Sequence, residues 1–96
     1  MIVHIVMFKF KDESKDINLQ KTKELLEVLV DLIPTLNSME VGINFTHTDR
    51  AFDLSLYSTF DTKEDLESYV VHEEHLKVVD FIKSVTTESK VVDYIL

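Results

Sequence analysis

Residues 2–10, with the sequence IVHIVMFKF, restrict the fold of this chain more than any other segment. β-Branched and aromatic residues dominate the segment, which is typical of a β-strand. Successive side chains of a strand point to opposite faces, and both faces of this strand are mostly apolar. The two sets are Ile2, His4, Val6, Phe8 and Phe10 on one face and Val3, Ile5, Met7 and Lys9 on the other. Such a strand is expected to be covered on both sides, by helices on one side and by something else on the other.

A helix and two strands are expected to follow. Residues 17–33 carry apolar side chains three or four positions apart, which predicts an amphipathic helix. Pro34 ends this helix because proline disfavours helical geometry in the residue before it. Residues 38–47 and 52–60 alternate between apolar and polar side chains like two half-buried strands, and residues 48–51 are short enough to join them as a hairpin.

The chain is expected to finish with a second helical region and a last strand. Thr62 begins the helical region in a sequence that resembles a capping box, and a break near His72 divides the region in two. The last strand runs over residues 90–95. The order β-α-β-β-α-β predicts a ferredoxin-like α+β fold, with a four-stranded antiparallel sheet and the helices on one face. We therefore predict a single domain over residues 1–96.

The same patterns predict where individual side chains lie. Phe45 falls on the apolar face of its strand, and Asp53 is expected to face solvent or an interface. Leu66, Tyr69 and Val70 are expected to form the buried stripe of the helix before the break. A second helical piece then carries Leu76, Val79, Ile82 and Val85.

The charge and composition of the chain exclude several classes of partner. The formal net charge is −8 and the single arginine is Arg50, so the chain has no basic face for nucleic acid or an anionic membrane. No apolar run approaches the roughly 20 residues of a membrane span, and no apolar leader precedes the first strand. The expected location is the cytoplasm. A chain of 96 residues forms one small core, and the apolar surface that remains favours association with a second copy.

Residues 69–75, with the sequence YVVHEEH, contain two candidate catalytic side chains, and His4 is a third. Imidazole titrates near about pH 6.5, so His75 would take a proton from a carbon flanked by carbonyls and return it later. The phenol of Tyr69 would donate a hydrogen bond to the developing enolate oxygen. Because these two residues are six positions apart, a break near His72 is needed to bring them together. The structural alternative makes Tyr69 a core residue, His75 a capping or surface residue, and His4 a core imidazole.

The same segment also contains two histidines of the kind that bind metals. Zinc peptidases place such histidines four positions apart on one helical face, whereas His72 and His75 are three apart and no third ligand follows. Glu73 and Glu74 stabilise the start of a helix through its dipole without any metal. We therefore predict no metal and no cofactor.

Taken in order, several segments resemble the stress-responsive α/β-barrel family, also called the Dabb domain. They are HIVMFKFK at 4–11, IPTL at 33–36, MEVG at 39–42, YVVHEEH at 69–75 and VDY at 92–94. The resemblance covers nearly the whole chain and implies a homodimer in which two sheets face each other as a joint barrel. In that arrangement Val3, Ile5 and Met7 face the sheet of the second copy, and His4, Val6 and Phe8 face the helices of their own chain.

The resemblance also implies a pocket between the sheet and the helices. Some plant members are similar to polyketide cyclases that need no metal, and the histidine and tyrosine that carry their chemistry match His75 and Tyr69. A histidine on their first strand matches His4. Leu26 and Leu54 stand where such pockets carry further polar groups, which makes the pocket of this chain more apolar.

We therefore predict that the chain binds a small, partly apolar molecule between the sheet and the helices. The candidate catalytic residues are His4, Tyr69 and His75, and the candidate lining residues are Phe8, Leu26, Leu54 and His72. Two alternatives stay open. One is a metal-independent cyclase or isomerase that acts on a β-keto compound, and the other is a non-enzymatic, stress-associated structural module.

Overall fold

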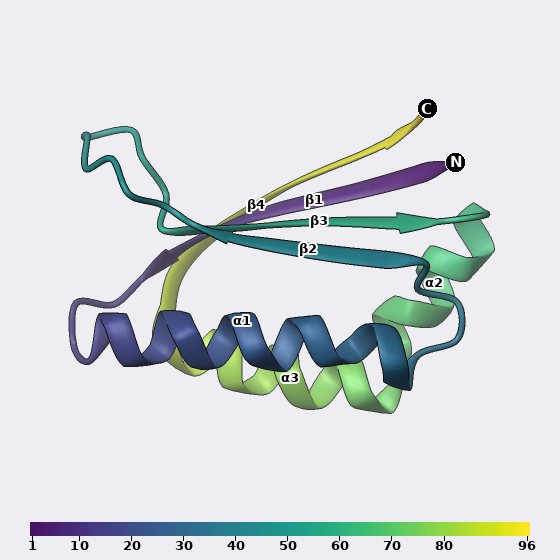
Figure 1. Ribbon diagram of the computed structural model, residues 1–96, viewed down its shortest axis with the longest axis horizontal. Helices are drawn as coiled ribbons and strands as arrows, with labels where there is room; N and C mark the ends of the chain where they lie inside the picture. The colour runs from purple at the N-terminus through teal and green to yellow at the C-terminus, as the bar shows by residue number, and fades with distance from the viewer.

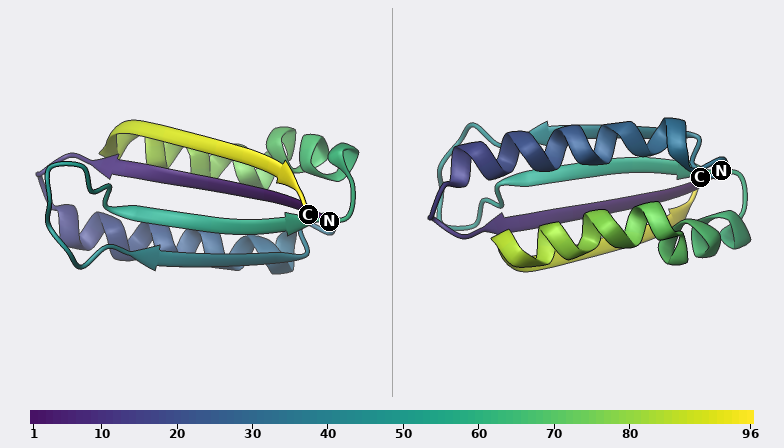
Figure 2. Two further views of the ribbon diagram at one scale, coloured as in Figure 1. Left: turned by 90° about the horizontal axis from the view of Figure 1, so that it is seen from above. Right: turned by 90° about the horizontal axis from the view of Figure 1, so that it is seen from below.

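The secondary-structure elements follow the predicted order in a computed structural model that describes residues 1–96. They are β1 (Ile2–Phe10), α1 (Lys15–Leu32), β2 (Ser38–Ile43), β3 (Leu54–Phe60), α2 (Lys63–Val71), α3 (Glu73–Val85) and β4 (Thr86–Ile95). The strands form one antiparallel sheet in the order β2-β3-β1-β4. All the helices lie on the same side of the sheet and leave its other face open (Figure 1 and Figure 2). The predicted ferredoxin-like α+β fold is confirmed.

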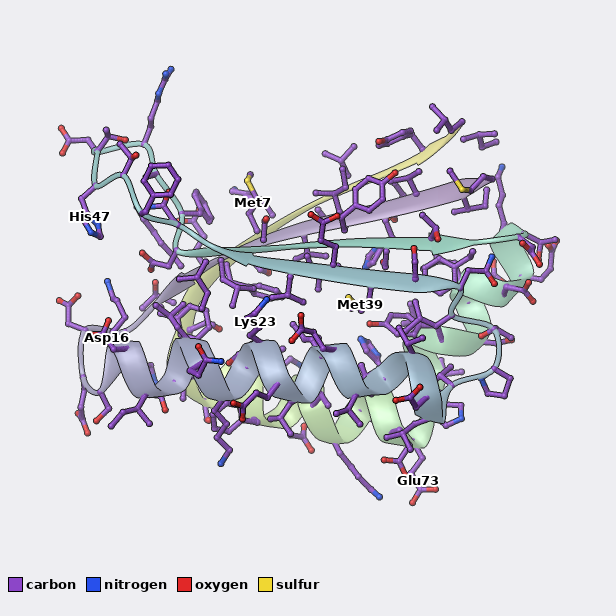
Figure 3. The ribbon with its side chains drawn as sticks, viewed as in Figure 1. Met7, Asp16, Lys23, Met39, His47 and Glu73 are labelled. Atoms are coloured by element: carbon purple, nitrogen blue, oxygen red, sulfur yellow. The ribbon has the colours of Figure 1, made fainter.

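The two faces of β1 point as the sequence predicts. Phe8 and Phe10 lie in the core beneath the helices. On the other face Val3 is buried, whereas Met7 is 41% exposed. Figure 3 shows Met7 projecting from the open face of the sheet and Met39 of β2 pointing toward α1. The chain therefore covers the helical face of β1 more fully than the open face.

The core lies between the sheet and the helices, and α1 supplies its centre. Leu26, Leu29 and Ile33 are each only 1% exposed. The helix ends at Leu32, and Ile33 already has extended backbone because Pro34 follows it, as predicted. None of the helices combines the length and the apolar character needed to span a membrane.

The second helical region breaks at His72, as predicted. Thr62 caps the start of α2, because its hydroxyl oxygen accepts a hydrogen bond of 3.1 Å from the backbone N–H of Asp65. The backbone of His72 is extended, with ψ at 137°, so it ends α2 and precedes the first residue of α3. The break therefore separates two helices with different axes.

The predicted apolar stripe of this region is only partly correct. Tyr69, Val78 and Ile82 are buried, whereas Val70 and Leu76 are exposed. The extended residue at position 72 redirects the chain, so α3 does not continue the buried face of α2 in register.

The connection between β2 and β3 is longer than the predicted hairpin turn and occupies residues 44–53. Phe45, which was expected on an apolar face, is 89% exposed in this loop. Asp53 does not face solvent or an interface as expected. Its half-buried carboxylate accepts a hydrogen bond of 2.7 Å from the backbone N–H of Phe10 and lies 3.7 Å from the ammonium of Lys15. These contacts fix the end of the loop against β1.

The last strand begins at Thr86 rather than at Lys90 and follows α3 without a loop. The Thr86 hydroxyl donates a hydrogen bond of 2.8 Å to the carbonyl of Ile82 and so completes the last turn of α3. The first residues of β4 are polar, and alternation in hydrophobicity therefore gave no sign of a strand there. On the open face of this edge strand, Val92 is 60% exposed and Tyr94 is 38% exposed.

Candidate functional site

A cavity with a volume of about 150 Å³ lies between the sheet and the helices. Side chains from β1, β3, β4 and every helix line it. They are His4, Val6, Phe8, Leu26, Leu56, Tyr69, His75, Val79, Ile82, Lys83, Thr86 and Ser89. The structure thus brings five of the predicted site residues to one cavity, namely His4, Phe8, Leu26, Tyr69 and His75.

Burial separates the closed end of this cavity from its mouth. Tyr69 and Leu26 are almost completely buried and form the closed end. Lys83, near the end of α3, and Ser89, on β4, are exposed lining residues. The mouth therefore opens between α3 and β4, next to the edge of the sheet.

Tyr69 lines the cavity and carries a hydrogen-bond donor. Its hydroxyl group is buried and has no hydrogen-bond partner in the protein. Burial raises the pKa of Tyr69 well above its ordinary value, so the phenol stays protonated. An unpartnered buried polar group costs roughly 1–3 kcal/mol, and a ligand that offers an acceptor would recover part of that free energy.

His75 lies against the ring of Tyr69, with 4.2 Å between the ring centroids. The extended backbone at His72 produces this contact, since on one straight helix the two side chains would point in different directions. The Nδ1 atom of His75 lies 2.9 Å from the carbonyl oxygen of Val70. Because a carbonyl oxygen only accepts, Nδ1 carries the proton, and Nε2 of the neutral ring keeps its lone pair.

The environment of His75 favours the neutral imidazole. Burial lowers the pKa of His75, and repulsion from the nearby imidazoles of His4 and His72 acts in the same direction. The hydrogen bond to Val70 opposes this shift but does not reverse it. At neutral pH the site therefore holds a neutral base, His75, beside a neutral acid, Tyr69.

His4 completes the group of polar side chains around the cavity. Its ring centroid lies 6.3 Å from that of Tyr69, in an edge-on arrangement. Its Nδ1 atom forms a hydrogen bond with the carboxylate of Asp93 on β4, the residue opposite it in the sheet register. The carboxylate accepts this bond, so it holds the imidazole in one orientation.

Leu54 and His72 do not line the cavity, although both were predicted as site residues. Leu54 is buried in the main core. His72 caps α3, since its Nδ1 atom accepts a hydrogen bond of 3.1 Å from the backbone N–H of Glu74. His72 contributes to the site indirectly, through the break that its backbone makes.

Asp93 and Lys83 are functional candidates that the sequence reasoning did not identify. The only available signal for Asp93 was its position in the last strand, where pairing with the first strand sets it opposite His4. Lys83 gave no signal beyond its place near a helix end. Both depend on the three-dimensional arrangement of β4 and α3 beside β1.

The structure brings no three histidine, aspartate or glutamate side chains close enough together to hold a metal ion. His72 and His75 have separate hydrogen-bonding roles, one with Glu74 and the other with Val70. The donor set around the cavity, two imidazoles and a phenol, suits proton transfer and hydrogen bonding to a carbonyl compound.

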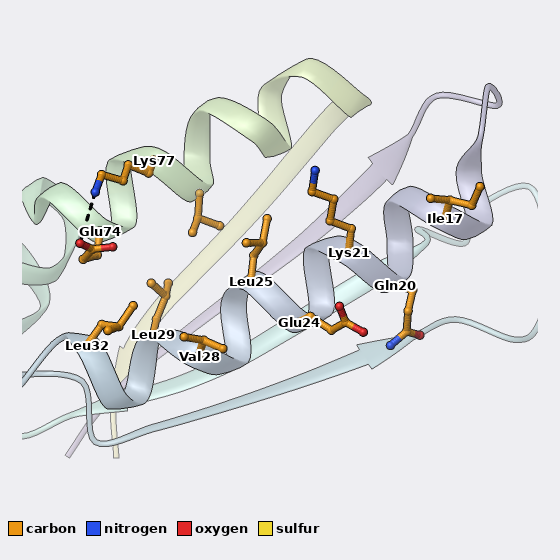
Figure 4. A pocket seen from close by; sticks show the side chains of 11 residues that line it. Ile17, Gln20, Lys21, Glu24, Leu25, Val28, Leu29, Leu32, Glu74 and Lys77 are labelled. Atoms are coloured by element: carbon orange, nitrogen blue, oxygen red, sulfur yellow. Dashed lines mark hydrogen bonds and ion pairs between the residues drawn. The ribbon is translucent and has the colours of Figure 1, made fainter.

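A larger groove of about 800 Å³ lies between α1 and α3, away from the sheet (Figure 4). Apolar side chains such as Leu25 and Val28 line it, and Glu74 and Lys77 pair with each other there at 3.4 Å. The ammonium of Lys21 lies over the ring of Phe81 instead of pointing at an open site. No group of unpaired titratable side chains converges in this groove, so the smaller cavity is the better candidate for chemistry.

Comparison with families of known proteins gives one clear match. A family model described as the stress responsive A/B barrel domain (Dabb) matches residues 2–96.

Two curated relatives are stress-response A/B barrel domain-containing proteins of Arabidopsis thaliana. The chain is 33% identical to the first of them over 82% of its own length and 30% of that protein. It is 30% identical to the second over 99% of its own length and 47% of that protein. The chain thus spans less than half the length of either plant protein.

Two further relatives are covered over nearly their whole length. Olivetolic acid cyclase of Cannabis sativa is 23% identical, over 97% of this chain and 94% of that protein. A dimeric protein of unknown function with a ferredoxin-like fold, from Bacteroides fragilis, is 30% identical and superimposes with a TM-score of 0.87, over 97% of this chain and 93% of that one.

Proposed function

This chain belongs to the family of stress-responsive A/B barrel (Dabb) domains, and we propose that it forms a homodimer and binds a small, partly apolar molecule between its sheet and its helices. One observation carries the proposal. Tyr69 lines the cavity, its buried hydroxyl has no partner in the protein, and its ring lies against that of His75. A native protein rarely leaves a buried donor unpaired unless a ligand or a water satisfies it.

The open face of the sheet supports the homodimer. Its central strand presents Ile5 and Met7, and the edge strand β4 adds Val92 and Tyr94. Burying such apolar side chains against an identical surface contributes about 25 cal/mol per Å². The similar protein from Bacteroides fragilis is itself described as dimeric.

The size and lining of the cavity define the ligand that it fits. A cavity of about 150 Å³ holds one aromatic ring or a short alkyl chain. The apolar walls, from Phe8, Leu26 and Leu56, favour such a body. Because Tyr69 can donate a hydrogen bond at the closed end, the ligand is expected to carry a carbonyl oxygen there.

Acetophenone and ethylbenzene test this ligand class directly, because they have nearly the same shape and only acetophenone carries a carbonyl. We expect acetophenone to bind with a Kd of about 1 mM, a reasonable value for a ligand of its size. Tyr69→Phe should weaken its binding roughly 3- to 10-fold, the value of about one hydrogen bond, and leave ethylbenzene unaffected. Titration followed by NMR chemical shifts provides the measurement.

Tyr57→Phe is the matched control, because Tyr57 lies on the opposite face of the sheet from the cavity. It should leave the affinity for both compounds unchanged. If neither compound binds, the proposed ligand site is wrong, and the non-enzymatic structural module becomes the better description.

Proton transfer is a second candidate function, and the contact between Tyr69 and His75 favours it. Nε2 of His75 would remove a proton from a carbon flanked by two carbonyls, and Tyr69 would donate a hydrogen bond to the enolate oxygen that forms. The proton returns from His75 to the product, so no metal is required. The similarity to a protein named as a cyclase supports this candidate.

Deuterium exchange at the central carbon of a 2-substituted 1,3-diketone measures this proton transfer without assuming a physiological substrate. We expect His75→Ala to remove the catalysed exchange, a loss of about 10²- to 10⁴-fold. His47→Ala is the matched control, because His47 is exposed in the loop after β2 and should leave the rate unchanged. Catalysed exchange that survives His75→Ala at the same rate would exclude His75 as the base.

A further inference from the structure

We infer that the ligands of this cavity carry a carboxylate, which Lys83 and Ser89 bind at the mouth while the rest of the molecule occupies the space between the sheet and the helices. The inference rests on the proposed function, because it specifies the ligand class of the same site. It makes the ligand a small keto acid with an apolar body.

Lys83 is the only lysine or arginine among the lining residues, and it forms no ion pair or side-chain hydrogen bond within the protein. Two other exposed lysines of the same region are paired, Lys77 with Glu74 and Lys90 with Glu88. Of the other titratable lining residues, His4 is hydrogen-bonded to Asp93, and Tyr69 and His75 are neutral at neutral pH. Lys83 is therefore the one free charge available to a ligand.

The geometry of α3 places Lys83 in line with the rest of the site. His75, Val79 and Lys83 are spaced by four residues, so they share one face of the helix, and all three line the cavity. Eight residues of helix correspond to roughly 12 Å between His75 and Lys83. Side chains on a helix lean toward its N-terminus, so a ligand that reaches from His75 to the Lys83 ammonium can be shorter than this backbone distance. Its expected length is that of an aromatic ring with a polar group at each end.

The polarity of the lining changes along this span. The hydroxyl of Tyr69 is an unpartnered donor at the closed end, and the middle is apolar. The exposed lining residues Lys83 and Ser89 mark the mouth and carry an ammonium and a hydroxyl group. A molecule that matches all three zones has an acceptor, an apolar body and an anionic end, in that order.

The net charge of the chain makes this selectivity a short-range effect. A formal charge of −8 repels anions from the protein as a whole. Salt screens that repulsion beyond about 8–10 Å, whereas a carboxylate in direct contact with Lys83 is screened much less. Lys83 is therefore expected to act on affinity at the mouth and not on long-range attraction.

Two rigid probes test the inference, 4-acetylbenzoate and its neutral amide, 4-acetylbenzamide. They share the acetyl group and the ring, and they differ in the charge at the far end. A second pair, 3-(4-acetylphenyl)propanoate and its amide, carries the charged or neutral group two carbons further from the ring. This pair covers the case in which Lys83 is too far from the ring for the first pair. Calorimetric titration of the dimer is expected to show tighter binding of the carboxylate in at least one pair, by about 3- to 10-fold.

Lys83→Gln should remove this preference and leave the affinity for the amide unchanged. Lys77→Gln is the matched control, because it deletes the same charge from the same helix outside the cavity. It should keep the preference. Equal binding of acid and amide in both pairs, with no effect of Lys83→Gln, would overturn the inference and leave the proposed function standing. Failure of all four probes and of acetophenone to bind would overturn both.

Discussion

The two faces of the sheet differ in what covers them. On the helical side, Phe8 and Leu54 are buried by the chain's own helices, and a small cavity remains between the sheet and the helices. On the other side, Met7 and Val92 are apolar but largely exposed. Apolar patterning predicted burial for both faces of β1, yet this chain alone covers the helical face more fully than the open face. The proposed ligand site lies on the face that the helices cover, whereas the other face is available to a second copy.

Mutations on the two faces should therefore have different effects. A change on the open face should alter association and leave the cavity intact. A change on the helical face should alter stability or ligand binding and leave association intact. The same type of substitution on opposite faces is therefore the most informative experiment.

Ile5→Asp is expected to have the largest effect, because it places a charge at the centre of the open face. In a two-fold dimer the substitution appears twice, and an unpaired buried charge costs about 3–5 kcal/mol each time. The dimer should dissociate to monomers or aggregate. Sedimentation equilibrium measures the mass.

Val28→Asp provides the control for that experiment, since Val28 is an apolar residue of similar size that is half-exposed on α1, on the helical side. It should remain dimeric. A dimeric mass for Ile5→Asp would show that the open face is not the interface.

Leu26→Ala is expected to have the next largest effect, because Leu26 is buried at the closed end of the cavity. The free energy of unfolding should fall by about 2–5 kcal/mol, the usual cost of removing a buried leucine side chain. Leu32→Ala, on an exposed part of the same helix, should cost about 0.5 kcal/mol. Chemical denaturation at one fixed protein concentration measures both, and equal losses would contradict the assigned core.

The smallest effect concerns pH and His75. The folded protein lowers the pKa of His75, so at low pH the unfolded chain binds the proton more readily than the folded one. Above about pH 6.5 the protonation of His75 costs the folded protein nothing. As the pH falls through and below that value, the free energy of unfolding declines. Between about pH 7.5 and pH 5.5, the Tm of the wild type should therefore fall more than that of His75→Gln.

His47→Gln should follow the wild type over the same range, because His47 is exposed. Identical pH profiles for the wild type and His75→Gln would mean that burial does not perturb His75.

Much of the fold follows from local patterns in the sequence. The apolar first strand, the helix that ends before Pro34, the cap at Thr62 and the break at His72 all lie where the sequence predicts. Each has a local cause, such as side-chain alternation, the geometry of proline or a hydrogen bond within three residues. The break also brings Tyr69 and His75 together, as the spacing of the two residues required.

The remaining features depend on contacts between distant segments. Asp53 is held by the backbone of β1, so the loop before it includes Phe45, which alternation alone assigned to a strand. Asp93 and Lys83 reach the site only because β4 and α3 lie beside β1. Leu54 was predicted in the pocket, but its side chain points into the core. No local pattern distinguishes a core position from a cavity wall.

A crystal structure of the dimer soaked with acetophenone tests ligand binding most directly. We expect the ring of the ligand between the sheet and the helices, with its carbonyl oxygen about 3 Å from the Tyr69 hydroxyl and close to His75. The two open faces of the sheets should meet in the same crystal. A cavity filled by Leu26 and Phe8, with the ligand absent or bound elsewhere, would contradict the proposed function.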